Sequence, residues 1–202
     1  MGAAYGIVGY PDVPRGEAAG ALAACEAALR EDGWIEGDHD PDAVYGDRGP
    51  TFRPAADGPA GRLLFMTHPV SGARMEMAIN GVSFCGPSYL NHGPFIDMPS
   101  FECPSCGGET RRETDGARAQ QERCFEMFGR YADADDALRQ VACVHCQAEV
   151  DINDLIADGP PTFVLSDVAV EFWDWPPDLI EPAAALMDRA LGRPHRMGWV
   201  HV

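Results

Sequence analysis

Two Cys-x-x-Cys pairs constrain this chain more than any other feature of its sequence. The first pair is Cys103 and Cys106, and the second is Cys143 and Cys146. Each pair can place two thiolates on one tight turn, and two such turns can close a tetrahedral site of four sulfurs around zinc. We therefore predict one zinc ion bound by these four cysteines. Because a closed four-thiolate site leaves no position for a substrate, we expect the zinc to stabilise the fold rather than to catalyse.

The turns that carry the two pairs differ in sequence. Gly107 and Gly108 follow the first pair, and glycine allows the sharp turn that points backbone N–H groups at the sulfurs. Gln147 stands in the second turn where the first has glycine, so we expect a weaker match to the motif there. The 36 residues at 107–142 between the pairs exceed the usual spacing of a zinc ribbon, which predicts an insertion.

Three other uses of the four cysteines compete with zinc. A thioredoxin-like redox pair opens a helix, and Pro104 with Gly107 argues against a helix at this position. Two structural disulfides need an oxidising compartment, and no signal peptide is visible at the start of the sequence. An iron–sulfur cluster also uses four cysteines. The spacing favours structural zinc among these alternatives.

Charge limits the chemistry and the partners of the chain. Its 202 residues have a formal net charge of −17, and all 15 of the Lys and Arg residues are arginines. The absence of lysine excludes Schiff-base catalysis by lysine and a Walker A phosphate loop. Zinc ribbons that bind nucleic acid usually carry basic faces, so we expect a protein partner rather than DNA or RNA. Acidity that only maintains solubility is the alternative.

Hydrophobicity places the chain in water rather than in a membrane. No stretch of about 18 consecutive apolar residues is present, so we expect no membrane span. The first residues lack the basic and apolar regions of a secretion signal. We therefore expect a cytoplasmic protein that does not bind membranes.

Hydrophobic periodicity predicts an α+β fold. Apolar residues at helical spacing indicate main helices at 17–30 and 178–191, and a narrower apolar face indicates a helix at 117–130. Residues 36–61 are rich in Gly, Asp and Pro and predict a long loop or meander. Strands are expected at 4–10, 62–67, 74–79, 82–87, 162–172 and 195–202.

This order predicts a mostly antiparallel sheet with two main helices and an inserted four-cysteine zinc-ribbon module. We expect residues 1–99 and 154–202 to form the N-terminal and C-terminal parts of one α+β domain. Residues 100–153 are expected to form the module.

Several segments resemble one family. They are Trp34–Gly37 (WIEG), Gly49–Pro54 (GPTFRP), the two cysteine pairs and above all Glu171–Pro177 (EFWDWPP). They resemble an uncharacterised family of bacterial zinc-ribbon proteins, common in actinomycetes, with a CPSCG…CPxCG ribbon followed by FWNWPPL. The resemblance covers most of the chain and implies the ribbon and the α+β frame, but no activity. Some members are labelled as ATPases of sugar transporters, a label that does not fit a chain without lysine or a GxxxxGK[ST] motif.

Catalytic motifs are weak in this sequence. It contains no GxSxG, HExxH or glycine-rich nucleotide loop. Cys85, His92 and Asp97 could form a thiol–imidazole–carboxylate set, which makes a hydrolase or transferase the alternative function. Nothing in the sequence fixes the geometry of such a set, so we expect no enzyme. Cys25 and Cys124 lack Cys-x-x-Cys partners and are expected in the core.

Aromatic residues gather near the end of the sequence, and two interpretations of them stay open. Trp173 and Trp175 could pack in the core, or they could form an exposed anchor for a protein partner held rigid by the prolines that follow. They are our candidate partner-binding residues. We therefore predict a non-enzymatic zinc-ribbon protein that binds another protein as an adaptor, accessory subunit or inhibitor.

Overall fold

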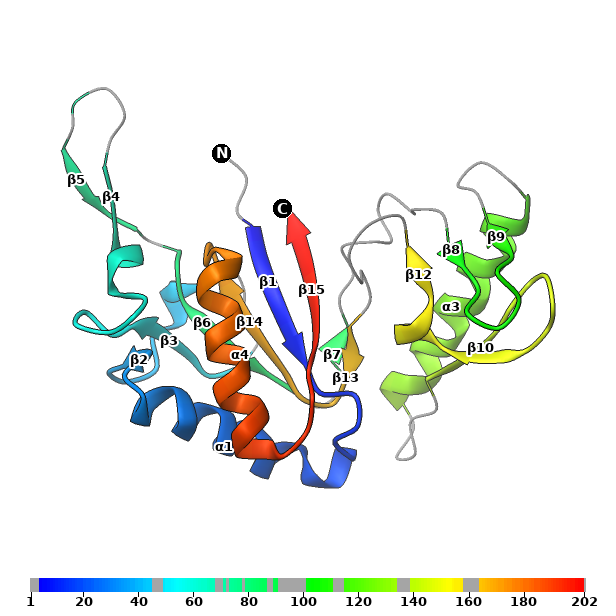
Figure 1. Ribbon diagram of the computed structural model, residues 1–202, viewed down its shortest axis with the longest axis horizontal. Helices are drawn as coiled ribbons and strands as arrows, with labels where there is room; N and C mark the ends of the chain where they lie inside the picture. Colours follow the sequence, from blue (N-terminus) through cyan, green and yellow to red (C-terminus); the bar gives the residue numbers. More distant parts are fainter. Residues whose placement is uncertain are drawn as a thin grey trace.

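The computed structural model describes residues 4–44, 49–67, 71, 73–77, 79–86, 89–90, 101–110, 115–133, 139–157 and 164–201. Within this part of the chain, the protein has an α+β fold. An antiparallel six-stranded sheet with two helices lies beside a smaller module that contains a third helix (Figure 1).

Both ends of the chain contribute strands to the six-stranded sheet. The strand order is β15-β1-β14-β6-β3-β2, and each neighbouring pair is antiparallel. The strands are β1 (Ala4–Gly9), β2 (Ile35–Glu36), β3 (Thr51–Pro54), β6 (Val82–Cys85), β14 (Ala169–Trp173) and β15 (Arg196–His201). The sheet is therefore completed only after the chain has left it at β6, formed the module and returned at β14.

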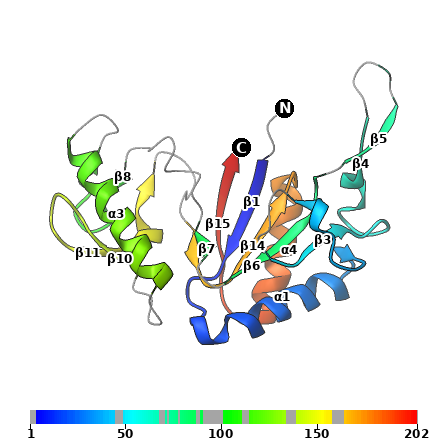
Figure 2. The same ribbon diagram turned by 180° about the vertical axis from the view of Figure 1, so that it is seen from behind.

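Two helices pack against each other and against one face of this sheet (Figures 1 and 2). They are α1 (Ala18–Glu31) and α4 (Pro177–Leu191), each within one residue of its predicted bounds. Leu29 of α1 and Ile180 of α4 are fully buried in the shared core. Gly192 ends α4 with a φ of 63°, a left-handed conformation that glycine adopts without strain.

The two faces of strand β14 pack in different apolar clusters. Val170 and Phe172 point toward the helices and are fully buried in the main core. Ala169 and Trp173 alternate with them and join a second apolar cluster on the opposite face. There the ring of Trp173 stacks on Tyr5 with their centroids 4.3 Å apart. The sheet is thus buried on both faces, which explains why β14 is apolar on both sides apart from Glu171.

Shorter elements complete the sheet region. The strands expected at 62–67 and 74–79 are present as β4 (Phe65–Thr67) and β5 (Arg74–Glu76), which pair as a hairpin that projects from the body (Figure 1). The predicted 162–172 strand pair is present as β13 (Leu165–Ser166) and β14, and β13 pairs with β7 (Tyr89–Leu90). The 3-10 turns are η1 (Arg15–Glu17), η2 (Pro41–Ala43), η3 (Gly61–Leu64) and η4 (Ile152–Asp154).

The expectation of a long loop at 36–61 needs correction, because β3 and part of β2 form there. Both strands are too short and too rich in proline or charge for their alternation to stand out in the sequence. They lie at one edge of the sheet, where proline is tolerated.

The module is built from two hairpins packed on one helix. β8 (Phe101–Glu102) pairs with β9 (Glu109–Thr110) and β12 (Ile156–Ala157), and β10 (Gln140–Ala142) pairs with β11 (Glu149–Asp151). Helix α3 (Asp115–Asp133) buries Cys124, Met127 and Tyr131 against these strands. One pair of cysteines lies at the end of each hairpin.

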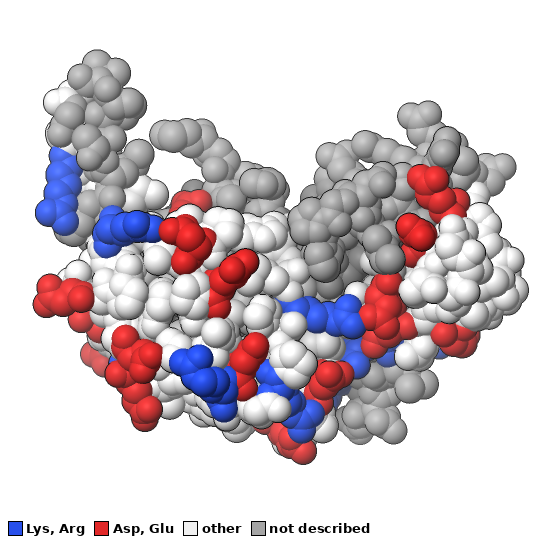
Figure 3. Space-filling model, viewed as in Figure 1, with Lys and Arg blue, Asp and Glu red and all other residues white. Residues whose placement is uncertain are grey.

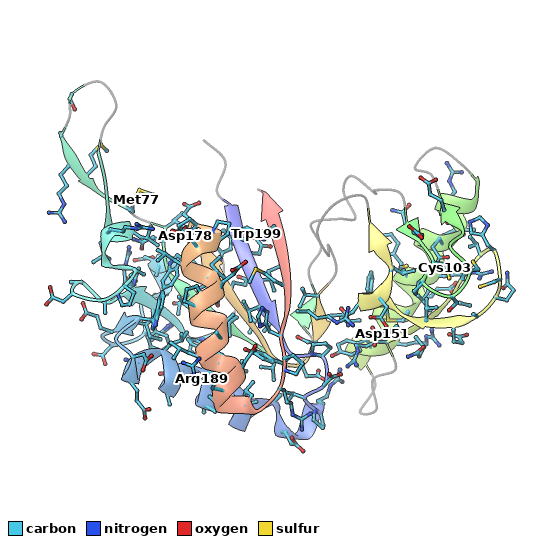
Figure 4. All side chains as sticks on the ribbon, in the orientation of Figure 1. Met77, Cys103, Asp151, Asp178, Arg189 and Trp199 are labelled. Carbon is cyan, nitrogen blue, oxygen red and sulfur yellow. The ribbon has the colours of Figure 1, made fainter. Side chains whose placement is uncertain are left out.

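Three arginines connect the module to the sheet domain. Arg15 donates to the Asp167 carboxylate at 2.9 Å and to the carbonyl of Tyr131 at 2.7 Å. Arg139 of the module donates to Asp151 and to the carbonyl of Pro11. Arg196 donates to Asp154 and to the carbonyl of Asn153. Figure 4 labels Asp151 on the side of the module that faces the sheet.

Among the described residues, no helix combines the length and the hydropathy needed to cross a membrane.

We predict that Phe172→Ala lowers the free energy of unfolding by about 3–5 kcal/mol, because it leaves a cavity beneath both helices. Phe125 is 48% exposed on α3. The matched variant Phe125→Ala should cost less than about 1 kcal/mol. Denaturant unfolding followed by tryptophan fluorescence measures both, and equal losses would contradict this assignment of the core.

Candidate metal centre

Four sulfurs meet at the ends of the two hairpins of the module. The Sγ atoms of Cys103, Cys106, Cys143 and Cys146 all lie within 4.8 Å of one another, and those of Cys103 and Cys146 are 4.0 Å apart. A tetrahedral zinc with Zn–S bonds of about 2.3 Å requires sulfurs roughly 3.8 Å apart. The arrangement therefore fits a single metal ion held by four thiolates. Figure 4 labels Cys103 in this cluster.

The first turn has the geometry that its glycines predict. The N–H of Gly107 donates to the carbonyl of Cys103 at 2.8 Å, and Gly107 has a φ of 63°. This conformation points the N–H of Gly108 at the Sγ of Cys106, 3.3 Å away. The backbone thus stabilises negative charge on the sulfur.

The second turn repeats this geometry without a glycine. Gln147 has a φ of 60°, and its N–H donates to the carbonyl of Cys143 at 3.0 Å. A left-handed conformation is strained for glutamine, but its side chain contributes hydrogen bonds to the turn. Its Nε2 donates to the carbonyl of Val144 at 3.0 Å, and its Oε1 accepts from Arg123 at 3.3 Å. The strain expected from the lack of glycine in this turn is therefore offset by the hydrogen bonds of the Gln147 side chain.

The protonation of the thiols shows why the cluster favours a cation. Burial opposes ionisation of Cys103, but hydrogen bonds from the N–H groups of Ser105 and Cys106 lower its pKa to about 7. The N–H of Gly108 favours the thiolate of Cys106, but desolvation and the sulfurs of its three neighbours outweigh it and raise that pKa to about 12. One thiol ionises readily and the next resists, because the charges repel each other. A bound dication would remove this repulsion.

His145 connects the two turns without being part of the sulfur cluster. Its Nε2 lies 3.1 Å from the hydroxyl of Thr110, and its ring lies over Gly108. A Cβ atom at Gly108 would come within 2.8 Å of the ring, so only glycine fits there. The two hairpin ends are thereby packed against each other.

Of the other described cysteines, two are core residues as expected, and the third, Cys85, is a candidate nucleophile. Cys25 and Cys124 are fully buried, away from the cluster, and burial raises the pKa of these thiols to about 12 and about 11. Both are therefore unreactive packing residues. Cys85 is 3% exposed on β6. His92 and Asp97, its candidate partners, lie outside the described residues.

Cys85 belongs to the apolar cluster on the face of the sheet away from the helices, and Ser83 is a polar neighbour of its sulfur there. The Oγ of Ser83 lies 3.5 Å from its sulfur, and Ser83 is paired across the sheet with Glu171. Glu171 is fully buried, and its carboxylate accepts from the Trp173 indole at 2.9 Å. Sequence reasoning missed Glu171, although a glutamate within the apolar run of Val168–Trp173 was a signal that could have found it.

The prediction that Trp173 and Trp175 form an exposed anchor is wrong. They are 1% and 2% exposed. Trp173 lies in a central strand, and Trp175 packs on Phe172 with its Nε1 donating to the carbonyl of Asn80 at 2.7 Å. Asp174, with a φ of 56°, forms the turn that directs Trp175 back into the helix-facing core. Core packing, the competing interpretation, is what the structure has.

Comparison of the chain with protein-family models, with curated proteins and with solved structures finds no match. The resemblance to the actinomycete zinc-ribbon family stays a prediction. The chemistry of the site is therefore interpreted from its own residues.

We predict that Gly107→Ala destabilises the module by about 1 kcal/mol, because alanine is strained at positive φ. Gly129 on α3 provides the matched control. Nothing lies within 4 Å of a Cβ atom there, so Gly129→Ala should stabilise the helix by roughly 0.5–1 kcal/mol. Thermal unfolding of the metal-loaded protein measures both, and the same sign for the two would contradict the geometry of the turn.

Proposed function

We propose that the four cysteines bind one zinc ion that keeps the module folded, and that the protein acts by binding another protein. The convergence of four sulfurs within 4.8 Å of one another supports this most strongly. Zinc suits the site because it accepts four thiolates in a tetrahedron without redox chemistry. A closed site of this kind makes the metal a structural element.

A role in protein binding is supported by the charge of the chain and by how its arginines are used. The net charge is −17, and Arg15, Arg139 and Arg196 are engaged within the protein. On the face in Figure 3, basic side chains are interspersed with acidic ones rather than gathered into a basic surface. This arrangement disfavours nucleic acid. We propose a cytoplasmic adaptor, accessory subunit or inhibitor, related to the actinomycete zinc-ribbon proteins.

We predict that the purified protein contains one zinc per chain and that Cys103→Ser abolishes zinc binding and unfolds the module. The sulfur is lost from a closed site, and metal binding and folding are coupled. Elemental analysis and hydrogen exchange at β10 and β11 measure these effects.

Cys124→Ala serves as the control, because it removes a buried thiol of the same module outside the cluster. It should lower stability but keep one zinc per chain. Protected β10 and β11 amides in a zinc-free Cys103→Ser protein would contradict a structural role for the metal.

A thiol-dependent hydrolase or transferase is a second candidate, supported by Cys85, Ser83 and Glu171 on one face of the sheet. Ser83 lies beside the thiol and across the sheet from Glu171, and a glutamate is rarely fully buried in a protein unless it is paired. We expect Cys85 nevertheless to react slowly with iodoacetamide at neutral pH, because it is buried. Rapid alkylation of Cys85 in the folded protein, absent from Cys85→Ala, would favour catalysis over simple binding.

A further inference from the structure

The ends of the two hairpins form an uncharged surface on a strongly acidic protein. Neither 103–108 nor 143–148 contains an Asp, Glu, Lys or Arg residue, although the chain carries 32 acidic residues. We call this surface the tip; its exposed members are Pro104, Ser105, Cys106, Gly107, His145, Cys146 and Gln147. In Figure 3 the far end of the module is a continuous uncharged area.

Acidic side chains surround the base of the tip. Glu102 and Glu109 are paired across β8 and β9, directly below the first turn, and Glu149 begins β11 below the second. All three residues are exposed. The surface therefore has a neutral centre and a rim that is acidic apart from Arg123, which donates to carbonyl groups of the second turn. Binding interfaces have this distribution, in which charge is depleted at the centre and polar groups lie around it.

The tip is also rigid. Both turns are closed by hydrogen bonds from their own backbones, and the packing of His145 on Gly108 holds the turns together. Arg123 fixes the base of the second turn by donating to the carbonyls of Ala142 and Cys143, at 2.9 and 3.1 Å. A surface that is ordered before binding loses little conformational entropy when a partner docks.

We propose that the tip is the partner-binding surface and that its partner is a protein segment with a neutral or apolar centre flanked by Lys or Arg residues. This proposal rests on the proposed function. The basic residues of the partner would pair with the acidic rim and accelerate association. Its N–H groups would donate to the exposed sulfurs of Cys106 and Cys146, which carry the negative charge of the metal-bound cluster.

The test uses the zinc-loaded full chain as target for a phage-displayed library of random peptides. We expect the selected peptides to carry basic residues around a neutral centre. Ser105→Glu places a charge in the middle of the tip and should weaken their binding at least about tenfold. Glu149→Arg reverses one charge of the rim and should also weaken binding, with a smaller dependence on salt.

Two control variants make the same charge changes on the exposed side of α1, far along the chain from the tip. Ala23→Glu and Glu31→Arg should leave the affinity of the selected peptides unchanged, and circular dichroism and zinc content confirm that each variant is folded. Binding that is equal in Ser105→Glu and the native chain overturns the proposal, as does selection of acidic peptides or of none. Zinc content distinguishes failure of the binding proposal from failure of the zinc proposal. One zinc per chain with no peptide binding at the tip would overturn the binding surface but leave the structural role of the metal intact.

Discussion

The close approach of four sulfurs at the end of the module is the feature on which its proposed metal site depends. The sulfurs lie within 4.8 Å of one another, and only a cation lets all four carry negative charge at that separation. The apolar cluster of the module is small, and two of its buried members are Cys103 and Cys143 themselves. In the proposed site, metal binding and formation of this core would be one process, as is usual for small metal-bound domains.

The sheet domain does not need this support, because it has a larger core. Two helices cover one face of the sheet, and a second apolar cluster including Tyr5 and Trp173 covers part of the other. The two parts of the molecule meet through polar contacts of Arg15, Arg139 and Arg196. The contacts of Arg15 and Arg139 involve the segment between β1 and α1, so the position of the module is coupled to the start of the first helix.

The sequence predicted those features that depend on local pattern. The two main helices, the hairpin of β4 and β5 and the convergence of the four cysteines on one site all follow from residue spacing. This spacing can be recognised within short segments of the sequence. The strands β2 and β3 were missed because they are short and because β3 depends on pairing with β6 and β2 on pairing with β3, contacts that no local pattern reveals.

Gln147, Trp173 and Trp175 show the same limit at the level of single side chains. Gln147 adopts the positive φ expected of glycine because Arg123 and the carbonyl of Val144 hold its side chain, and these partners are not apparent from the sequence. The motif around Trp173 and Trp175 leaves core packing and an exposed anchor both open, and it makes the two residues candidates for binding a partner. The turn at Asp174 instead directs the second tryptophan into the core.

X-ray absorption at the zinc edge tests the central claim most directly, because it reports the ligands of the metal in the native protein. Four sulfur ligands at about 2.3 Å would be the signature of the closed site that the geometry indicates. Fewer sulfurs with added nitrogen or oxygen ligands would contradict a closed structural site. An absorption edge of iron in place of zinc would contradict the identity of the metal.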